Sequence, residues 1–374
     1  MLQRRREKRD VKLVLTGGHA GSTAYAVVEE LRARSLKWKI FWIGAKRAVE
    51  GTHVPTFEKE IFPKIGVSFI PIFSGRVQRK FSIWTIPSLL KIPFGFLHAL
   101  YLLLKIKPKI VVSFGGFAAF PVVIVAWGLR VPVIVHEQTV AVGRANKYSA
   151  FFADKIALAR RQSAKYFPKD KIVVVGNPVS TKIAKIMPKD KKGFPPTLLI
   201  TGGSRGSVFI NDLIDSVLET LLKEYTVIHQ TGVYQYSKFK RRKSGLGKSI
   251  KKRYRVHGLV LPWDWYKLIK SSDIVVSRAG ANAVSEIIYA KRPAIFIPLP
   301  FSYHNEQAKN AHYAQKYGTA IVLEQKKATP KIFLKKIDSM NTNWLKIVNK
   351  ARDIVSPDKG AAKRFVDLIE NYTQ

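Results

Sequence analysis

Cysteine is absent from the 374 residues of this chain, and acidic residues are scarce. Without cysteine the chain forms neither disulfides nor thiolate metal sites, which suits a reducing compartment such as the cytoplasm. The 25 Asp and Glu residues face 65 Lys and Arg residues, for a formal net charge of +40. This charge predicts an anionic partner: nucleic acid, an acidic bilayer or a phosphorylated substrate.

Two further absences limit the possible functions. No Asp-x-Asp pair occurs, so we expect no metal site and no obligatory metal or other cofactor. No apolar run reaches the roughly 20 residues that a membrane-spanning helix needs. The most apolar region, 81–104, contains Lys91, and Pro87 and Pro93 are expected to break its helix. After the basic residues 1–10, the apolar run ends at Leu15, which indicates a strand rather than a signal peptide.

A glycine-rich turn occurs twice, each time after a short apolar run and before a helical pattern. The copies are Thr16-Gly17-Gly18-His19-Ala20-Gly21-Ser22 and Thr201-Gly202-Gly203-Ser204-Arg205-Gly206-Ser207. Such a turn gathers backbone N–H groups at a helix N-terminus, where phosphate binds well. One copy often serves only to connect a strand to a helix, but two matched copies predict paired nucleotide-binding halves facing one cleft.

Strand-like and helix-like segments alternate along almost the whole chain, which predicts an α/β protein with a doubly wound parallel sheet in each half. The expected strands are 11–15, 39–43, 67–72, 110–114, 131–135, 156–158 and 172–175, then 198–201, 226–230, 253–257, 274–277, 294–297 and 320–323. The expected domains are 1–180 and 197–357, with an exposed linker at 181–196 and a C-terminal helix at about 358–374 that can pack back on the first domain.

The turn Ser277–Glu286 places polar groups at the carboxyl end of an expected strand, where ligands bind in open parallel sheets. Arg278 and the amides of the turn suit a diphosphate, and Glu286 suits the two hydroxyls of a ribose. The alternative interpretation is that Glu286 is an ordinary charge on a helix surface.

Several motifs, taken together and in this order, resemble the MurG family of membrane-associated glycosyltransferases. They are Gly115-Gly116-Phe117, His136-Glu137-Gln138, Gly176-Asn177-Pro178-Val179, Gly202-Gly203-Ser204, Arg278 to Glu286, and Asn305-Glu306-Gln307 with Asn310. The resemblance spans nearly the whole chain and implies a GT-B fold of two Rossmann-like domains. It also implies inverting transfer of N-acetylglucosamine from UDP-GlcNAc to the 4-hydroxyl of the MurNAc of lipid I. The product would be lipid II, made for the cell wall at the cytoplasmic face of the membrane by a peripheral enzyme.

The resemblance also assigns site residues. The implied donor contacts are Ser204, Arg278, Gly280, Ala281, Asn282, Ala283, Val284, Ser285, Glu286, Gln307 and the backbone of Val260, with Gly17, Gly18, Thr139 and Ser180 from the first half. The implied contacts of the acceptor pyrophosphate are Gly17, Gly18, Gly115, Gly116, His136, Glu137 and Gln138. Thr139 stands where the family usually has Asn, Ser180 where it has Arg, and Glu306 where it has Gln.

The first glycine turn departs from the family pattern Gly-Gly-Thr-Gly-Gly-His, so the family's base maps to His19 or, without a gap, to Ser22. A base that works near neutral pH can be an imidazole but not a serine hydroxyl, which favours His19. His19 also suits a cap on the following helix. We expect His136 to hydrogen-bond neighbouring loops rather than to act as a second base, and His229 and His257 to be structural.

A basic segment runs into the apolar region and suits an amphipathic element on an anionic bilayer. The resemblance implies membrane contact here, through Arg76, Arg79, Lys80, Phe81, Trp84 and Phe94. About half of the apolar residues in 97–104 are expected to be buried in the core instead.

Three alternatives remain. Another GT-B enzyme, such as a glycolipid glycosyltransferase or a sugar-nucleotide epimerase, would share the fold. A basic nucleic-acid-binding protein would share the charge, although the aromatic residues cluster with aliphatic ones and no nucleic-acid-binding module is recognisable, so we expect no nucleic-acid partner. An inactive homologue would fit Thr139 and Ser180.

Overall fold

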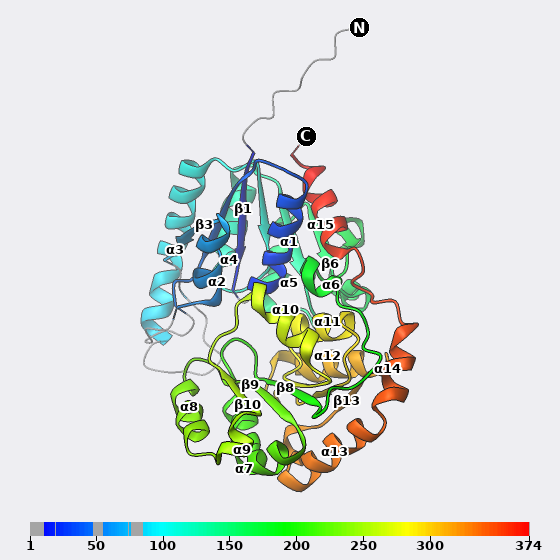
Figure 1. Cartoon of the computed structure of the whole chain (residues 1–374). Coiled ribbons are helices and arrows are strands. Elements are labelled where there is room, and N and C mark those ends of the chain that lie inside the picture. Colours follow the sequence, from blue (N-terminus) through cyan, green and yellow to red (C-terminus); the bar gives the residue numbers. More distant parts are fainter. Residues whose placement is uncertain (1–10, 19, 48–54, 74, 76–84, 374) are drawn as a thin grey trace. The chain divides into compact units, whose positions relative to one another are not determined.

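The computed structural model describes residues 11–18, 20–47, 55–73, 75 and 85–373. The chain divides into two compact units, one formed by residues 1–180 with 360–374 and the other by residues 181–359. Each unit has its own parallel sheet with helices packed on it. In Figure 1 the first unit is coloured blue through cyan to green and includes the red C-terminal helix, and the second unit is coloured green to orange-red.

The first unit contains a sheet of seven strands in the order β3-β2-β1-β4-β5-β6-β7. The strands are β1 (Lys12–Gly17), β2 (Lys39–Gly44), β3 (Ser68–Pro71), β4 (Ile110–Ser113), β5 (Val133–Glu137), β6 (Lys155–Leu158) and β7 (Ile172–Val174). Its α-helices are α1 (Gly21–Ala33), α2 (Phe57–Ile61), α3 (Thr85–Ile106), α4 (Ala119–Gly128), α5 (Arg144–Ser149) and α15 (Ala361–Glu370).

The second unit contains a sheet of six strands in the order β10-β9-β8-β11-β12-β13. The strands are β8 (Thr197–Thr201), β9 (Thr226–Gln230), β10 (Tyr254–His257), β11 (Ile274–Ser277), β12 (Ala294–Phe296) and β13 (Ala320–Val322). Its α-helices are α6 (Thr181–Ala184), α7 (Val208–Glu224), α8 (Tyr236–Ser244), α9 (Lys248–Lys251), α10 (Pro262–Ser271), α11 (Ala281–Tyr289), α12 (Glu306–Gln315), α13 (Pro330–Thr342) and α14 (Trp344–Arg352).

Every strand expected from the sequence is present, with ends shifted by at most two residues. The central strands β4 and β11 have the same sequence, Ile-Val-Val-Ser, and are buried at every position. Continuous β-branched runs of this kind are typical of parallel strands that are covered by helices on both faces. The prediction of two doubly wound α/β halves is confirmed.

The expected break at Pro87 and Pro93 is wrong, because α3 is continuous from Thr85 to Ile106. Pro87 lies in the first turn, where its missing N–H has no intrahelical partner to lose. Pro93 lies inside the helix and removes one hydrogen bond, at a cost of about 3 kcal/mol. Burial of Ala99, Leu102 and Leu103 against the sheet offsets this loss.

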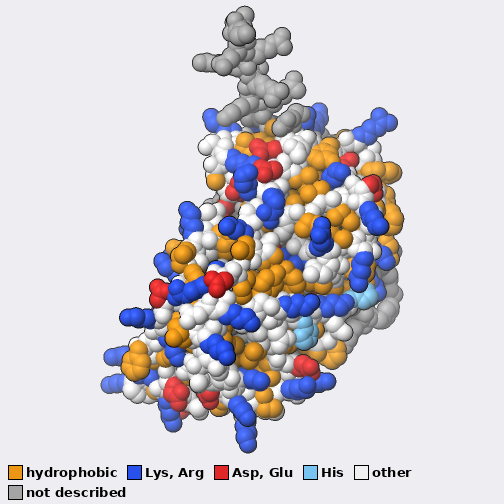
Figure 2. Space-filling model, turned by 90° about the vertical axis from the view of Figure 1, so that its right-hand side faces the viewer, with side chains coloured by type: hydrophobic (Ala, Val, Ile, Leu, Met, Phe, Trp, Pro, Cys, Tyr) orange, Lys and Arg blue, Asp and Glu red, His pale blue; other side chains and the backbone are white. Residues whose placement is uncertain are grey.

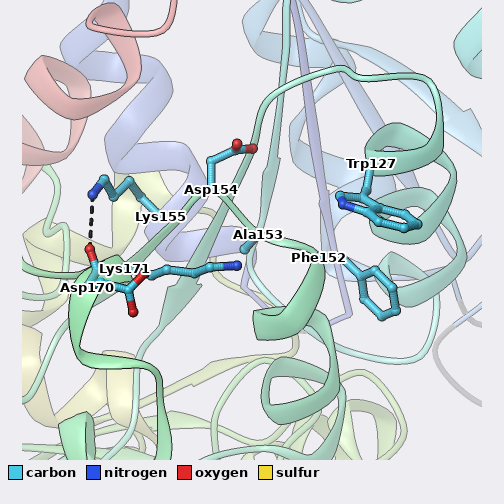
Figure 3. Close-up of a pocket in the computed structure, with 7 residues that line it drawn as sticks. All are labelled: Trp127, Phe152, Ala153, Asp154, Lys155, Asp170 and Lys171. Atoms are coloured by element: carbon cyan, nitrogen blue, oxygen red, sulfur yellow. Dashed lines mark hydrogen bonds between the residues drawn. The ribbon is translucent and has the colours of Figure 1, made fainter.

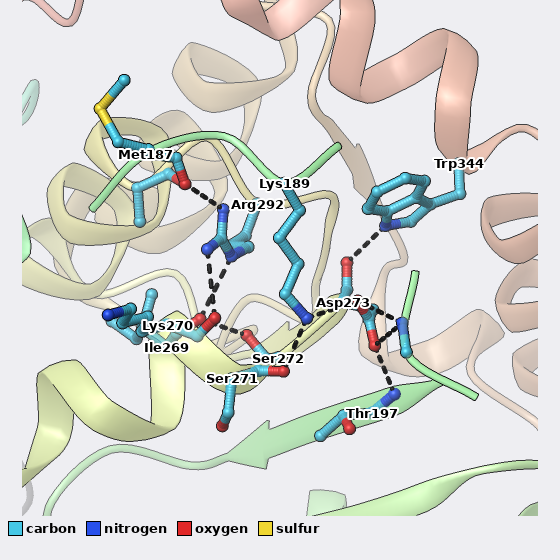
Figure 4. A network of polar contacts seen from close by, with 12 residues as sticks. Met187, Lys189, Thr197, Ile269, Lys270, Ser271, Ser272, Asp273, Arg292 and Trp344 are labelled. Atoms are coloured by element: carbon cyan, nitrogen blue, oxygen red, sulfur yellow. Dashed lines mark hydrogen bonds and ion pairs between the residues drawn. The ribbon is translucent and has the colours of Figure 1, made fainter. Parts of the chain in front are cut away.

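The expected linker at 181–196 is grouped with the second unit and is bonded to it (Figure 4). Asp273, directly before β11, is fully buried and accepts hydrogen bonds from Lys189 Nζ (2.7 Å) and from the backbone N–H of Thr197 (2.7 Å). Arg292 donates to the carbonyl oxygen of Met187 (3.2 Å). These contacts attach the segment to β11 and to the end of α11.

The C-terminal helix α15 packs beside α1 in the first unit (Figure 1). Arg34 at the end of α1 forms ion pairs with Asp367 (2.7 Å) and Glu370 of α15. Phe365 is buried with its ring centroid 4.8 Å from that of His136.

Candidate functional site

The predicted glycine turns follow the central strands at which chain order reverses in each sheet. In the first unit the turns follow β1 and β4, and in the second unit they follow β8 and β11. In each sheet these two strands are hydrogen-bonded neighbours. Ligands bind at such switch points in open α/β sheets, so the topology gives each unit one candidate ligand site.

In the first unit the two glycine turns touch through their backbones. Gly116 has a φ of +97°, and a Cβ placed on it would lie 2.8 Å from the Gly18 Cα. Gly115 has a φ of +80°, and its Cβ would lie 2.4 Å from Asn146 Oδ1. Glycine is therefore required at both positions by conformation and by space.

The N-terminus of α1 carries a carboxylate of the chain itself. Glu58 of α2 is only 3% exposed, and its Oε1 accepts a 3.1 Å hydrogen bond from the backbone N–H of Gly21. A carboxylate at this end of a helix is favoured by the helix dipole. Sequence reasoning missed Glu58, because nothing in its local pattern indicates that α2 packs against the start of α1.

His136 and Glu137 turn inward at the end of β5 and organise the loops there. The His136 ring is buried, and its Nε2 lies 3.1 Å from the carbonyl oxygen of Gly176, which confirms that it bonds a neighbouring loop. Glu137 accepts hydrogen bonds from the backbone N–H of Thr139 (3.0 Å) and from Asn146 Nδ2 (2.9 Å). Burial raises the pKa of the Glu137 carboxyl, while these hydrogen bonds favour its ionised form.

The side chain of Thr139 is also committed to this loop, since its hydroxyl lies 2.9 Å from Glu137 Oε1. Ser180 is buried at the end of the first unit, and Gln138 is half-buried just after β5. Several predicted residues lie outside the described part of the chain: His19, Arg76, Arg79, Lys80, Phe81 and Trp84.

In the second unit the turn after β8 packs tightly on one side and is open on the other. A Cβ on Gly206 would lie 2.0 Å from the carbonyl oxygen of Thr231, because this turn lies directly against the one after β9. A Cβ on Gly203, at a φ of +85°, would meet nothing within 4 Å. Gly203 and the neighbouring, half-buried Ser204 therefore border open space at the start of α7.

Arg278 joins the turn after β11 to the start of α7. Its Nε donates to Ser207 Oγ (3.1 Å), and its Nη1 donates to the carbonyl oxygens of Ile297 (3.0 Å) and Pro298 (3.3 Å). Nη2 makes no hydrogen bond to any described residue. Burial lowers the pKa of Arg278 to about 10, which still leaves it charged at neutral pH. One guanidinium edge remains available for an anion.

The start of α11 presents backbone donors. The residue before its first turn, Gly280, supplies no side-chain cap, and a Cβ there would meet nothing within 4 Å. Ala281, Asn282 and Ala283 are partly exposed. Val284 and Ser285 are buried, so these two would reach a ligand only through their backbone. An uncapped helix N-terminus beside a buried arginine suits a diphosphate.

Glu286 follows in the next turn of α11 and is 8% exposed. Burial raises the pKa of its carboxyl to about 7. Trp265 of α10 donates from its indole Nε1 to Glu286 Oε2 at 2.7 Å. The interpretation of Glu286 as an ordinary surface charge is therefore wrong. Sequence reasoning missed Trp265, which lies in no recognised motif.

Two other predicted donor contacts flank this region. Gln307, in the first turn of α12, accepts a 3.0 Å hydrogen bond from the backbone N–H of Leu299 through its Oε1. Val260 is buried between β10 and α10. His229 is confirmed as structural: its ring is buried between Tyr254 Oη (2.9 Å) and Asn211 Oδ1 (3.0 Å), and burial lowers its pKa to about 3.

Another pocket of the first unit lies away from these residues (Figure 3). It is lined by Trp127, Phe152, Ala153, Asp154, Lys155, Asp170 and Lys171, where β6 and β7 begin. Since the glycine turns lie at the opposite ends of parallel strands, this pocket shares no residue with the predicted site. On the face drawn in Figure 2, Lys and Arg side chains are scattered and outnumber acidic ones, as the composition predicts.

Comparison with known proteins identifies two family domains in the chain, of which the second also includes α15. Residues 13–158 match the glycosyltransferase family 28 N-terminal domain, and residues 197–371 match the C-terminal domain of the same family. One relative, from Clostridium tetani, is 32% identical over 96% of this chain and 98% of its own length. Its name is UDP-N-acetylglucosamine–N-acetylmuramyl-(pentapeptide) pyrophosphoryl-undecaprenol N-acetylglucosamine transferase, and a relative with this name from Clostridium kluyveri is 31% identical over 96% of this chain and 99% of its own.

The chain belongs to the MurG family. Among solved structures, Acinetobacter baumannii MurG matches 96% of this chain and 99% of its own with a TM-score of 0.66, at 23% identity. A UDP-GlcNAc 2-epimerase from Neisseria meningitidis, bound to UDP-GlcNAc, matches 96% of this chain and 99% of its own with a TM-score of 0.64, at 14% identity. Both structures show the same fold, and the resemblance to the MurG family that the motifs indicated is confirmed.

Proposed function

We propose that this chain transfers N-acetylglucosamine from UDP-GlcNAc to the 4-hydroxyl of the MurNAc of lipid I and so makes lipid II. The observation that carries the proposal is the match over nearly the whole chain to transferases named for this reaction, at 32% identity. The open turns around Arg278 and the buried Glu286 in the second unit support it, because a sugar nucleotide offers a diphosphate and two ribose hydroxyls.

The proposed roles follow the two units. In the second unit, the N-terminus of α11 and the Nη2 edge of Arg278 would stabilise the charge that develops on UDP as it leaves. In the first unit, the turns at Gly17, Gly18, Gly115 and Gly116 would bind the acceptor pyrophosphate, with Gln138 beside them. His136, Glu137 and Thr139 would shape that loop from within.

The proposed reaction is a single in-line displacement that inverts the anomeric carbon. His19 would take the proton of the acceptor hydroxyl, whose oxygen attacks the sugar as the bond to UDP breaks. Among the described residues, no three His, Asp or Glu side chains are grouped to hold a metal ion. We propose that no metal is required; turnover that survives excess EDTA would support this, and loss restored by Mg²⁺ would contradict it.

The decisive experiment is a turnover assay with UDP-GlcNAc and a lipid I analogue. Wild type should form the disaccharide product with inverted stereochemistry. His19→Ala should lose at least about a hundredfold in rate, the usual effect of removing an acid–base group, while Ser22→Ala should keep most of the activity. Near-normal turnover by His19→Ala would refute its role. Formation of an epimerised sugar nucleotide without transfer would favour an epimerase instead.

We also propose that α3 rests on the cytoplasmic face of an anionic membrane, where the enzyme is peripheral. An apolar stripe recurs along the described part of this helix at Phe94, Leu97, Tyr101 and Leu104, which are 59%, 64%, 57% and 52% exposed. Ala99, Leu102 and Leu103 are buried instead, so about half of the apolar residues in 97–104 face the core, as predicted. No helix in the described ranges is long and apolar enough to span a bilayer.

A vesicle flotation assay tests the membrane proposal. Wild type should bind vesicles that contain anionic lipid, and binding should weaken with salt because basic residues contribute. Leu97→Glu combined with Leu104→Glu should abolish flotation, because it places charge in the apolar stripe. Equal flotation of this variant would place the contact elsewhere. Cell-wall synthesis, and through it cell shape and division, would depend on the activity.

A further inference from the structure

The buried carboxylate of Glu286 is held by a residue from a different helix. Trp265 of α10 donates its indole N–H to Glu286 Oε2 at 2.7 Å, a short and strong geometry. The two helices lie beside one another in the second unit (Figure 1). Among the described residues, Trp265 is the only hydrogen-bond partner of the Glu286 carboxylate. The orientation of Glu286 therefore depends on one N–H group.

We infer that Trp265 is a positioning residue of the donor site, which orients Glu286 to accept hydrogen bonds from the ribose hydroxyls of UDP-GlcNAc. The inference rests on the proposed function. A carboxylate offers about four lone-pair sites, and the indole uses one, so both oxygens can still accept a hydroxyl. A long side chain held in place also loses less conformational entropy when the ligand binds.

The same contact acts on the charge of Glu286. Burial raises the pKa of this carboxyl to about 7, and the hydrogen bond from Trp265 opposes the rise because it favours the ionised form. No charged side chain contributes to the shift. The charged or titratable groups around Glu286 lie directly after β11, on α11 and on the helices packed against α11. They are Arg278, Tyr289, Lys182, Asp264, Tyr266, Lys267, Lys270, Glu306, Lys309, His312 and Tyr313.

Donor binding should therefore depend on pH in a defined direction. Ribose hydroxyls donate to the ionised carboxylate, so UDP-GlcNAc should bind more weakly as the pH falls through about 7. The diphosphate of UDP-GlcNAc is a diester and does not titrate in this range. Without the indole N–H, the midpoint should move to higher pH.

Calorimetric titration of the full chain with UDP-GlcNAc from pH 6 to pH 9 tests the inference. Trp265→Phe keeps a ring but removes the donor, so it should weaken binding at pH 7 by about tenfold and raise the midpoint. Glu286→Gln should bind weakly with a flat pH profile. In the Glu286→Gln background, Trp265→Phe should weaken UDP-GlcNAc binding by less than about a further twofold, because both substitutions remove the same interaction. Trp127→Phe, at a tryptophan 56% exposed in the first unit, is the matched control and should bind as wild type does.

Three results would overturn the inference. They are an unchanged Trp265→Phe profile, an equal loss in the Glu286→Gln background, and an equal loss in Trp127→Phe. If Trp265→Phe does not fold, the indole N–H signals of ¹⁵N-tryptophan-labelled wild type decide: one signal should titrate near pH 7 and cease to do so in Glu286→Gln. Wild type that binds no UDP-GlcNAc would end the proposed function and the inference together, whereas normal binding and turnover with an unchanged Trp265→Phe would end the inference alone.

Discussion

The starts of α1 and α11 are alike in topology and opposite in what they offer a ligand. Each helix follows a glycine-containing turn after a central strand of its sheet. At α1 the first N–H already binds the buried carboxylate of Glu58 at 3.1 Å. At α11 the cap is Gly280, which has open space beyond it and Arg278 next to it. A helix N–H that already bonds a carboxylate of the chain is not available to an anion, so the start of α1 offers an anion fewer free donors than the start of α11.

The largest expected effect is a loss of stability in the turn after β8 of the second unit, on the side that packs against the turn after β9. Gly206→Ala should lower the free energy of unfolding by about 3 kcal/mol or more, because a Cβ would lie 2.0 Å from the Thr231 carbonyl at a φ of +77°. Gly203→Ala, at a φ of +85° but with nothing within 4 Å, should lose only about 1 kcal/mol. Denaturant unfolding of both variants measures the difference, and equal losses would mean that backbone strain alone decides.

The next effect tests whether Arg278 makes the second site different from the first. Arg278→Met should weaken UDP-GlcNAc binding by about ten- to a hundredfold, the range for a lost hydrogen bond to a charged group. Arg292→Met is the matched control, because the guanidinium of Arg292 is also buried but bonds the chain's own carbonyls through all three nitrogens. Calorimetry well below each variant's unfolding transition should find that Arg292→Met binds UDP-GlcNAc with unchanged affinity. Equal weakening of UDP-GlcNAc binding in both variants would mean that Arg278 has only a structural role.

The smallest expected effect concerns the N-terminus of α1, where the N–H of Gly21 bonds Glu58. Glu58→Gln should lower the free energy of unfolding by about 1 kcal/mol, because a charged acceptor at the helix N-terminus becomes neutral. UDP-GlcNAc affinity, which depends on the second unit, should stay within about twofold. Thermal unfolding and calorimetry measure the two quantities. A large loss of donor affinity in this variant would contradict the contrast between the two helix starts.

The sequence was a good guide where local pattern determines structure. Short β-branched runs such as Ile-Val-Val-Ser predicted buried parallel strands, and the turns after them were therefore expected at the ligand-binding edge of each sheet. Local pattern failed at Pro93, where packing of the rest of α3 outweighs a lost hydrogen bond. It also gave no sign that the segment 181–196, whose polar composition indicates a linker, is attached to the second unit by Asp273 and Arg292 (Figure 4).

Trp265 and Glu58 show the limit of sequence reasoning at the site. Each acts on a residue of another helix, 21 positions away for Trp265 and 37 for Glu58. No periodicity or motif connects such pairs, since their contact depends on how two helices pack. Likewise, His136, Glu137 and Thr139 lie in a motif that suggests ligand contact. In the structure His136 bonds the loop at Gly176, and Glu137 and Thr139 bond each other.

The amino-acid sequence by itself determined two doubly wound halves, their strand positions, the glycine turns at the switch points and membership of the MurG family. These depend on the period of apolar residues and on backbone conformations that only glycine readily adopts. Tertiary structure alone decided which helix N-terminus stays open, which arginine keeps an unused edge and which carboxylate is held by an indole. These depend on which side chains desolvate and bond one another across elements, a property of packing that a linear pattern does not contain.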